Sequence, residues 1–283
     1  MKTSIVLEGG GMRGAYSAGC LSWLLDNNIS FDSAYGISTG AVHLCSYLMN
    51  SKELLYNCAT DYIADDKLIG MKSIMREKTY VGYNLLFSDI LPNAGYHIKN
   101  AQNNPCKAKI GLYDLDLGKC IYKSVDEIDE KMELLKASTT LPIIGRLVNY
   151  DGHKYLDGGI TDMIPIDEAI RDGNEKFLVI TTKPHDFVRE PASGAIVSLM
   201  GLTYPKHKSV KADYKIRHIN YNKQVAKVHE LEEEGLAIHM APSKTIPVKR
   251  MTGDKPSLRI LFDLGYADME ARKDEIIAAF RKD

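Results

Sequence analysis

Short apolar runs alternate with amphipathic segments along the first part of the chain. Residues 3–8 (TSIVLE) are β-branched and apolar and end at glycines, which predicts a short buried strand. Residues 15–26 and 39–49 carry apolar side chains at helical spacing, and residues 32–35 between them predict a second strand. The order strand, glycine loop, helix, strand, sharp turn, helix is typical of a parallel sheet with crossover helices.

The pattern is less regular in the middle of the chain. Residues 51–100 have little periodicity and predict a mixture of helix and loop. Further on, the pattern predicts a strand pair at residues 107–114 and 119–123, a helix at 130–138, a hairpin at 148–155 around Asp151-Gly152, and a buried strand at 177–182.

From about residue 186 the chain becomes more polar. Residues 203–234 are rich in Lys, His, Tyr and Glu and predict a long exposed helix. Residues 244–259 predict a basic loop, and residues 261–281 a charged helix. We therefore expect a core domain over residues 3–185 and a C-terminal extension over 186–283 that completes or flanks it.

Composition narrows the classes of protein that fit. A chain of 283 residues that is 45% hydrophobic suits one large α/β domain or two small ones. The net charge of -1 gives no overall basic field, so we expect no nucleic-acid partner. The cysteines are odd in number and form no C-x-x-C pair, which predicts free thiols rather than disulfides or a zinc site. They are Cys20, Cys45, Cys58, Cys106 and Cys120.

The sequence also bears on membranes. The first residues, MKTSIVLEGGG, lack the long apolar run of a signal peptide. No stretch approaches the ~18–20 apolar residues that a spanning helix needs. We expect a cytoplasmic protein, at most peripheral at a membrane. The basic residues Lys206, His207, Lys208 and Lys211 would suit anionic headgroups, although a solvated helix face is the simpler interpretation.

Residues 7–14 read LEGGGMRG, directly after the first predicted strand. Three glycines followed by an arginine suit a backbone that approaches negative charge closely. The spacing Gly9-x-Gly11-x-x-Gly14 matches the G-x-G-x-x-G pattern that binds dinucleotide phosphates. The same loop would also serve as an oxyanion hole, whose amides face a charge that exists only during a reaction. The loop alone leaves both alternatives open.

A second motif, Gly36-Ile37-Ser38-Thr39-Gly40, has the form G-x-S-x-G. It lies between a predicted strand and a predicted helix, as in a nucleophile elbow, where glycines relieve crowding around a strained serine. A serine in such a turn is more often only a helix cap. The strand before it and the amphipathic helix after it favour Ser38 as a nucleophile.

A serine nucleophile needs a base, and Asp157-Gly158-Gly159 offers one. The two glycines would let the backbone pack closely and hold the Asp157 carboxylate at a strand end. Asp-Gly is also a strong turn signal, so the segment by itself predicts a turn. A free Asp has a pKa of ~3.9. The apolar residues around Ile143 and Ile144 and at 160–164 are compatible with burial that raises this pKa.

Taken together, GGGMRG, GISTG and DGG, in this order, resemble the motifs of the patatin-like phospholipase family. Residues 137–142 (ASTTLP) are similar to the family's A-S-x-x-x-P block, and residues 157–165 (DGGITDMIP) to its D-G-G followed by a short loop and Pro. The resemblance covers roughly residues 3–182. Residues 230–235 (ELEEEG) and 261–268 (LFDLGYAD) resemble the extension of a bacterial cytoplasmic branch.

The resemblance implies an α/β fold: a three-layer α/β/α sandwich with a mostly parallel central sheet and a mainly helical C-terminal extension. It also implies a Ser-Asp dyad, with Ser38 as nucleophile, Asp157 as general base and the amides of Gly10, Gly11 and Met12 as the oxyanion hole. Arg13 would steady the loop or meet a lipid phosphate. The supporting residues would be Gly9, Arg13, Gly14, Gly36, Gly40, Gly158 and Gly159.

The implied substrate is a fatty acyl ester, such as a phospholipid or lysophospholipid, with no metal and no cofactor. Residues 80–87 (YVGYNLLF) suit an acyl-chain wall or lid, although core packing is the simpler interpretation. The acyl position, the chain length and the oligomeric state stay open.

Three alternatives compete with this hypothesis. A dinucleotide-binding oxidoreductase would need an acidic residue at the end of the second strand, and Asp32 is roughly there. An α/β-hydrolase with a Ser-Asp-His triad would need a late histidine, and His218, His229 and His239 all lie in the polar C-terminal region. A catalytically inert lipid-binding relative would keep the fold alone. His43, on the helix after the elbow, suits packing or support of the site better than a base.

Overall fold

The computed structural model describes residues 1–281 and contains one 8-stranded sheet. The strand order is β5-β6-β3-β2-β1-β7-β8, and β4 pairs with β3 off this path. The strands are β1 (Thr3–Leu7), β2 (Ser33–Ile37), β3 (Lys107–Asp114), β4 (Lys119–Ser124), β5 (Val148–Tyr150), β6 (His153–Asp157), β7 (Lys176–Ile180) and β8 (Ala237–Met240).

The centre of the sheet is parallel. β1 lies between β2 and β7 and runs parallel to both, and β8 and β3 continue this direction at either side. β4 and β6 pair antiparallel with β3, and β5 pairs antiparallel with β6. Because β1 and β2 are parallel neighbours, the loops that follow them meet at the same edge of the sheet, which is where ligands bind in such folds.

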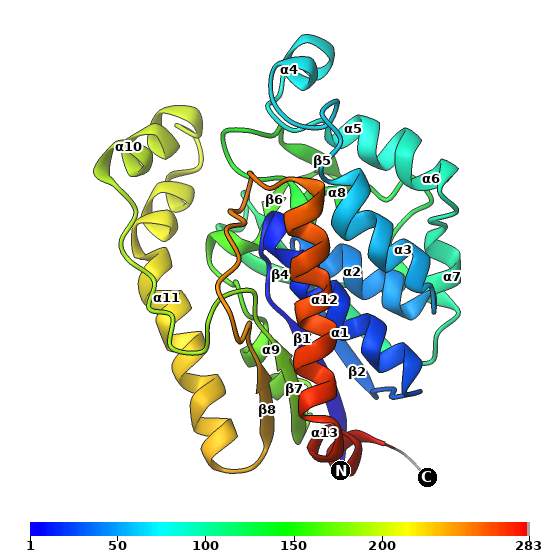
Figure 1. Cartoon of the computed structure of the whole chain (residues 1–283). Helices are drawn as coiled ribbons and strands as arrows, with labels where there is room; N and C mark the ends of the chain where they lie inside the picture. Colours follow the sequence, from blue (N-terminus) through cyan, green and yellow to red (C-terminus); the bar gives the residue numbers. More distant parts are fainter. Residues whose placement is uncertain (282–283) are drawn as a thin grey trace.

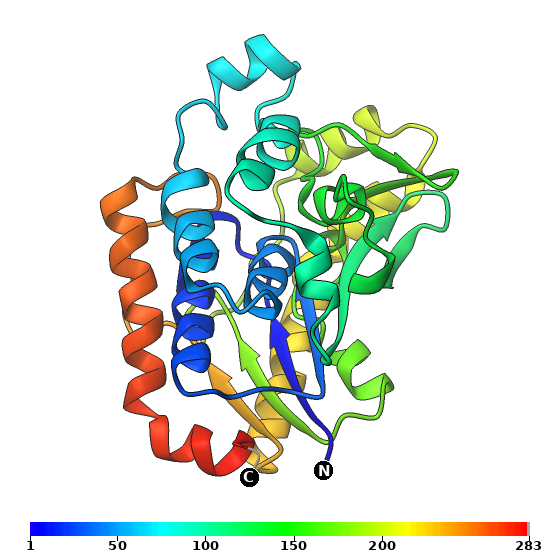
Figure 2. The same ribbon diagram turned by 90° about the vertical axis from the view of Figure 1, so that its right-hand side faces the viewer.

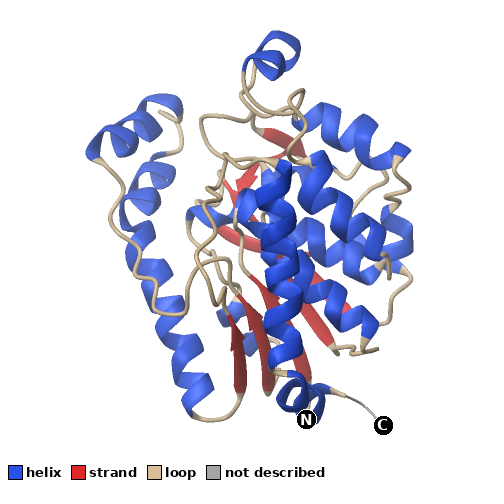
Figure 3. Ribbon diagram, viewed as in Figure 1, coloured by secondary structure: helices blue, strands red, loops and turns tan. Residues whose placement is uncertain are grey.

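Helices cover both faces of the sheet (Figures 1 and 3). The α-helices are α1 (Ala15–Asp26), α2 (Thr39–Leu48), α3 (Lys52–Asn57), α4 (Met71–Glu77), α5 (Tyr83–Leu85), α6 (Leu91–Asn93), α7 (Ile98–Gln102), α8 (Glu133–Thr139), α9 (Ile166–Arg171), α10 (Gly194–Thr203), α11 (Lys208–Glu233), α12 (Lys255–Ala271) and α13 (Lys273–Phe280). Short 3-10 turns are η1 (Gly11–Gly14), η4 (Val125–Glu127) and η5 (Gly158–Ile160), and π-helical turns are η2 (Cys58–Tyr62) and η3 (Leu86–Ile90).

The alternation of side chains along β1 divides the core. Ile5 and Leu7 belong to the larger cluster with residues of α1, α2 and α12. Val6 faces the other way and joins the cluster formed with α9 and α11. Strands buried on both faces read as continuous apolar runs, which is why TSIVL and KFLVI show no polar alternation. The sheet is therefore the middle layer of three, as the two views show (Figures 1 and 2).

The predicted fold class is confirmed: a mixed α/β protein with a mostly parallel central sheet and a helical C-terminal region. Residues 51–100, predicted as a mixture of helix and loop, contain α3 to α7 joined by loops. The details differ in two places. The predicted basic loop at 244–259 ends early, because α12 begins at Lys255 behind an Asp254 cap. The C-terminal region also contributes a strand, β8, to the sheet edge. The boundary near residue 185 stays a prediction.

None of the helices in the described part of the chain is long and apolar enough to cross a membrane.

Candidate active site

Ser38 occupies the turn between β2 and α2. Its backbone has φ 58° and ψ -129°, a conformation that non-glycine residues rarely adopt. Such strain persists only where the surrounding structure enforces it, and it concentrates at functional sites. The turn packs tightly on β1, since a Cβ added at Gly40 would lie 2.9 Å from the carbonyl oxygens of both Leu7 and Glu8. Ser38 thus sits at the N-terminus of α2, where the helix dipole favours negative charge.

A second serine holds this turn from behind. The Ser38 amide donates to Ser138 Oγ at 3.3 Å, and the Ser138 hydroxyl donates to the Gly111 carbonyl oxygen at 2.8 Å. Ser138 is fully buried near the end of α8 and belongs to the ASTTLP block. The Ser138 hydroxyl therefore links the elbow to β3. This explains why a serine suits this position of the block.

Asp157 ends β6 and lies beside the elbow. Its side chain lines the same cavity as Ser38, and the Gly159 amide donates a hydrogen bond to Oδ1 at 2.7 Å. Burial raises the pKa of the Asp157 carboxyl above its ordinary value, against the opposing effects of the Ser38 hydroxyl, the Gly159 amide and the Arg250 and Arg217 charges. The structure therefore brings Ser38 and Asp157 to the same cavity, and burial makes the Asp157 carboxylate the stronger base.

The glycine loop lies next to Ser38, and its three predicted amides differ in their present partners. The Gly10 amide donates to Thr39 Oγ1 at 3.2 Å, and the Met12 amide donates to the Arg250 carbonyl oxygen at 2.9 Å. The Gly11 amide has no hydrogen-bond acceptor among residues 1–281. Gly11 has φ 59°, and a Cβ there would collide with Arg250, so only glycine fits. The role of the three amides as an oxyanion hole stays a prediction.

A buried ion pair supports this loop from the sheet side. Glu8 is fully buried and accepts hydrogen bonds from the Thr182 amide at 2.6 Å, from the Thr182 hydroxyl at 2.9 Å and from Lys183. Although burial raises the pKa of the Glu8 carboxyl, the Lys183 charge and these donors bring it below its ordinary value. The chain directly before Gly9 is therefore tied to the end of β7.

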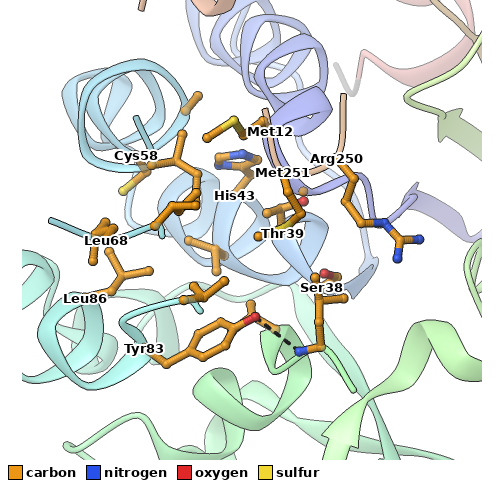
Figure 4. Close-up of a pocket in the computed structure, with 18 of the residues that line it drawn as sticks. Met12, Ser38, Thr39, His43, Cys58, Leu68, Tyr83, Leu86, Arg250 and Met251 are labelled. Carbon is orange, nitrogen blue, oxygen red and sulfur yellow. Dashed lines mark hydrogen bonds between the residues drawn. The ribbon is translucent and has the colours of Figure 1, made fainter. Parts of the chain in front are cut away.

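An apolar cavity opens on one side of Ser38 (Figure 4). It holds about 60 Å³ and lies between α2 and the helices of residues 52–93. Its apolar and aromatic lining includes Met12, Ala15, Val42, Cys58, Ala59, Ile63, Leu68, Ile69, Val81, Tyr83, Leu86, Leu91, Leu141 and Met251. Three of these come from the stretch 80–87 that the sequence singled out. Tyr83 also accepts a hydrogen bond from the Leu141 amide at 3.1 Å, which fixes its ring against the cavity.

A second, smaller cavity also reaches Ser38. Asp157, Tyr214, Arg217 and Arg250 line it together with the glycine loop. Burial, followed by the positive charges of Arg250 and Arg189, lowers the pKa of the Arg217 guanidinium to about 9. No ion pair of Arg217 or Arg250 with a carboxylate is found in the described residues. Two guanidinium groups therefore face this cavity, and the Asp157 carboxylate offsets part of their charge.

Three further residues considered in the sequence analysis are Arg13, His43 and Asp162. Arg13 is partly buried on the loop, and burial is the main cause of its lowered pKa. His43 is buried beside Gly14, and burial lowers its pKa to about 4. Asp162 accepts a hydrogen bond from the Tyr122 hydroxyl at 3.0 Å, as a polar contact of its loop.

A Ser-Asp-His triad would need one of the late histidines beside Ser38. Within residues 1–281, neither cavity beside Ser38 is lined by His218, His229 or His239.

Tight contacts surround the other predicted glycines, as a Cβ on any of them would lie 3.0 Å or less from a neighbouring heavy atom. These are Gly9, Gly14, Gly36, Gly158 and Gly159.

Sequence reasoning did not identify Ser138, Arg217 or Arg250 as site residues. Ser138 belongs to the ASTTLP block, which resembles a family motif. That resemblance could have identified it as a site residue. Arg217 lies on α11 and Arg250 in the loop before α12, both far along the chain from the motifs. Nothing in their local sequence distinguishes them from solvated basic residues.

Two family models match parts of the chain. Residues 5–170 match the model of the patatin-like phospholipase family, and residues 207–281 match a domain of unknown function, DUF6363. The uncharacterized protein YjjU of Escherichia coli K12 is 28% identical over 204 residues, which cover 67% of this chain and 54% of that protein. Probable lipid hydrolase 463L of Invertebrate iridescent virus 6 is 26% identical over 198 residues, covering 61% and 65%.

The chain therefore spans between about half and two thirds of the length of these relatives. Among solved structures, VipD from Legionella pneumophila aligns with a TM-score of 0.45 and 13% identity, over 97% of this chain and 67% of that one.

Proposed function

Because the chain belongs to the patatin-like phospholipase family, we propose that it is a serine acyl hydrolase that cleaves fatty acyl esters of lipids. The observation that carries this proposal is that Ser38, in its strained turn, shares one cavity with the buried Asp157 carboxylate and lines an apolar cavity as well. The finer assignment, a Ser38–Asp157 dyad served by the amides of Gly10, Gly11 and Met12, is part of the same proposal.

The reaction follows from this arrangement. Asp157 takes the proton of the Ser38 hydroxyl as its oxygen attacks the ester carbonyl carbon. The carbonyl oxygen becomes an oxyanion, which the Gly11 amide can receive directly and which the Gly10 and Met12 amides reach if their present bonds are exchanged. The protonated Asp157 then gives its proton to the departing alcohol. Water activated by the same carboxylate hydrolyses the acyl-Ser38 ester. Each amide donor at the oxyanion is worth about 3–4 kcal/mol in such sites.

The two cavities support a lipid substrate with distinct ends. The apolar cavity suits an acyl chain, and the Arg217 and Arg250 guanidinium groups suit a phosphate on the alcohol side of the ester. A phospholipid or lysophospholipid carries both features on either side of the scissile ester. The name of the viral relative, a probable lipid hydrolase, agrees with this class.

Contact with a lipid surface is also part of the proposal. α4 and α10 project at the end of the molecule toward which β1 runs (Figure 1). They carry exposed apolar side chains, among them Met71 (70% exposed), Met75 (71%) and Leu202 (78%). Single exposed apolar residues are common, but several on two projecting helices would suit contact with a bilayer at the headgroup level.

The test is hydrolysis of p-nitrophenyl acyl esters and of phospholipids by the wild-type chain, Ser38→Ala and Asp157→Asn, with EDTA present. We expect turnover by the wild type and a loss of at least about 10³-fold in both variants, because each removes a partner of proton transfer. Circular dichroism checks that both variants stay folded.

Asp162→Asn is the matched control, because Asp162 is a partly buried carboxylate whose pKa burial also raises. It should keep most of the activity. If Asp157→Asn remains active, the base lies elsewhere and the dyad is wrong. If the wild type hydrolyses none of the esters, the lipid hydrolase assignment itself is wrong and the inert lipid-binding alternative replaces it.

A further inference from the structure

Three histidines that are distant in the sequence meet at the edge of the sheet. His185 lies in the loop after β7, His229 on α11 and His239 in β8. One ring nitrogen of each lies within 4.8 Å of the corresponding nitrogens of the other two. The ring centroids of His185 and His229 are 4.4 Å apart, and those of His185 and His239 are 4.8 Å apart. Three imidazoles in such proximity form a ligand set typical of zinc.

The hydrogen bonds of these rings select the nitrogens that are free to bind. The Thr181 hydroxyl donates to the Lys183 carbonyl oxygen, so it can only accept from His239 Nε2, 2.9 Å away. His239 then carries its proton on Nε2 and a lone pair on Nδ1. That Nδ1 is buried and has no hydrogen-bond partner within residues 1–281, in a side chain only 3% exposed. A buried lone pair without a donor is costly, and a metal ion would satisfy it.

The other two histidines complete the arrangement. His185 Nε2 lies 2.9 Å from the Glu232 carboxylate, which accepts its N–H and leaves Nδ1 as the lone-pair nitrogen. Metal-binding histidines characteristically donate their second ring N–H to an oxygen in this way. Nε2 of His229 is buried and also lacks a partner in the described part of the chain. The set is therefore Nδ1 of His185, Nδ1 of His239 and Nε2 of His229.

We propose that His185, His229 and His239 bind a zinc ion that joins the C-terminal region to the edge of the sheet. Tetrahedral binding at bond lengths of ~2.0–2.1 Å places ligand nitrogens roughly 3.3 Å apart, so the site must close slightly around the metal. His185 is the member that can move, since its side chain is 54% exposed and the loop that carries it is on the surface. Its ring, now stacked on His229, turns toward the metal while Glu232 stays its partner.

This site is separate from the hydrolase centre. It is built around Thr181 and Lys183, which follow β7, whereas Ser38 lies in the turn after β2. Lys183 itself pairs with Glu8 at the start of the glycine loop. The metal would thus fix β8 and the end of α11 to the segment that supports the loop, without touching substrate.

Zinc binding to the chelator-treated chain of residues 1–283, measured by isothermal titration calorimetry, tests the proposal. We expect one Zn²⁺ per chain, no comparable binding of Mg²⁺, which prefers oxygen ligands, and a zinc-dependent rise in Tm of about 5 °C. His185→Gln and His229→Gln should each weaken zinc binding by at least about tenfold. His97→Gln is the control, because His97 is an exposed histidine at the start of α7 and outside the cluster.

His185 is exposed, so its substitution leaves the fold intact and keeps the test decisive. Absence of saturable binding near one ion per chain would overturn the proposal. So would unchanged affinity in both cluster variants, which would assign the bound zinc to other ligands such as the partly exposed thiols of Cys106 and Cys120.

Discussion

The base strength of a single carboxylate decides how the proposed dyad can work. Asp157 is 2% exposed, and its burial raises its pKa. The hydroxyl of Ser38 and the Gly159 amide work against this by stabilising the charged form. A dyad has no histidine between base and nucleophile, so the protonation state of Asp157 should control the rate directly.

We therefore predict a single acidic limb in the pH dependence of kcat/KM. Above the pKa of Asp157 the carboxylate is charged and accepts the serine proton, so the rate is at its plateau. As pH falls through that raised pKa the carboxyl becomes neutral and the rate declines, with a midpoint above the ~3.9 of a free Asp. The measurement is kcat/KM for a p-nitrophenyl ester between about pH 4 and 9, with circular dichroism at each pH.

A midpoint at or below ~3.9 would show that burial does not set the base strength of Asp157. A limb near the ~6.5 of histidine that persists in every active variant would instead point to an imidazole.

At the residue scale, the sequence predicted the groups that motifs carry. Ser38, Asp157 and the glycine loop were recognisable because their chemistry demands fixed local spacing. Arg217 and Arg250 were not, because they reach the site through the packing of α11 and of the loop before α12. Ser138 acts through one hydrogen bond to the Ser38 amide, and such a bond leaves no periodic signal.

Two helices from opposite ends of the described chain pack with unusual closeness. A Cβ added to Gly19 of α1 would collide with the Phe262 carbonyl oxygen of α12, and one added to Gly265 of α12 would collide with that of Tyr16. The two glycines thus let the helix backbones touch. Cys20 Sγ donates to the Gly265 carbonyl oxygen at 3.4 Å in the same contact.

We predict that Gly265→Ala destabilises the protein by about 2–3 kcal/mol, because the added methyl forces the two backbones apart. The free energy of unfolding in urea measures this. Gly194→Ala is the control, since Gly194 begins α10 and a Cβ there meets no heavy atom within 4 Å. It should be neutral or slightly stabilising. Equal effects of the two substitutions would show that the α1–α12 contact is not close in solution.

At the element scale, the clearest successes were the elements with long or continuous patterns. Helix Ala15–Asp26 has the predicted bounds, and β1 and β7 follow from their apolar runs. β8 was missed because its four residues, AIHM, are too few to show a period. α11 was predicted as an exposed helix, yet it buries Val210, Tyr221 and Val228 against the sheet layer. Its apolar positions are too few to stand out among many charged ones.

The core is shared between the two units that the sequence proposed. Phe177 and Val179 of β7 pack in one cluster with Tyr221 and Val228 of α11. On the opposite face, residues of α1 share a cluster with Leu258 of α12. The sheet therefore depends on residues beyond 185 for cover on both sides.

We predict that a chain ending at residue 185 does not fold cooperatively. Its exposed apolar faces should bind the dye ANS and aggregate, and it should lack the sigmoidal urea transition of the full chain. A soluble fragment with native near-ultraviolet circular dichroism and a cooperative transition would instead make residues 3–185 an independent domain.

The close packing of α1 against α12 described above also bears on how the protein is made. Trp23 of α1 donates to Glu270 of α12 at 2.6 Å, across 247 positions of sequence, and the Arg250 carbonyl oxygen holds the Met12 amide of the glycine loop. Contacts of such separation lengthen the search for the native state and slow folding. On the ribosome, the glycine loop and the elbow emerge long before α12 can join them. The nascent chain would then carry the proposed nucleophile in an unfinished site, and the proposed hydrolysis would begin only once synthesis has passed α12.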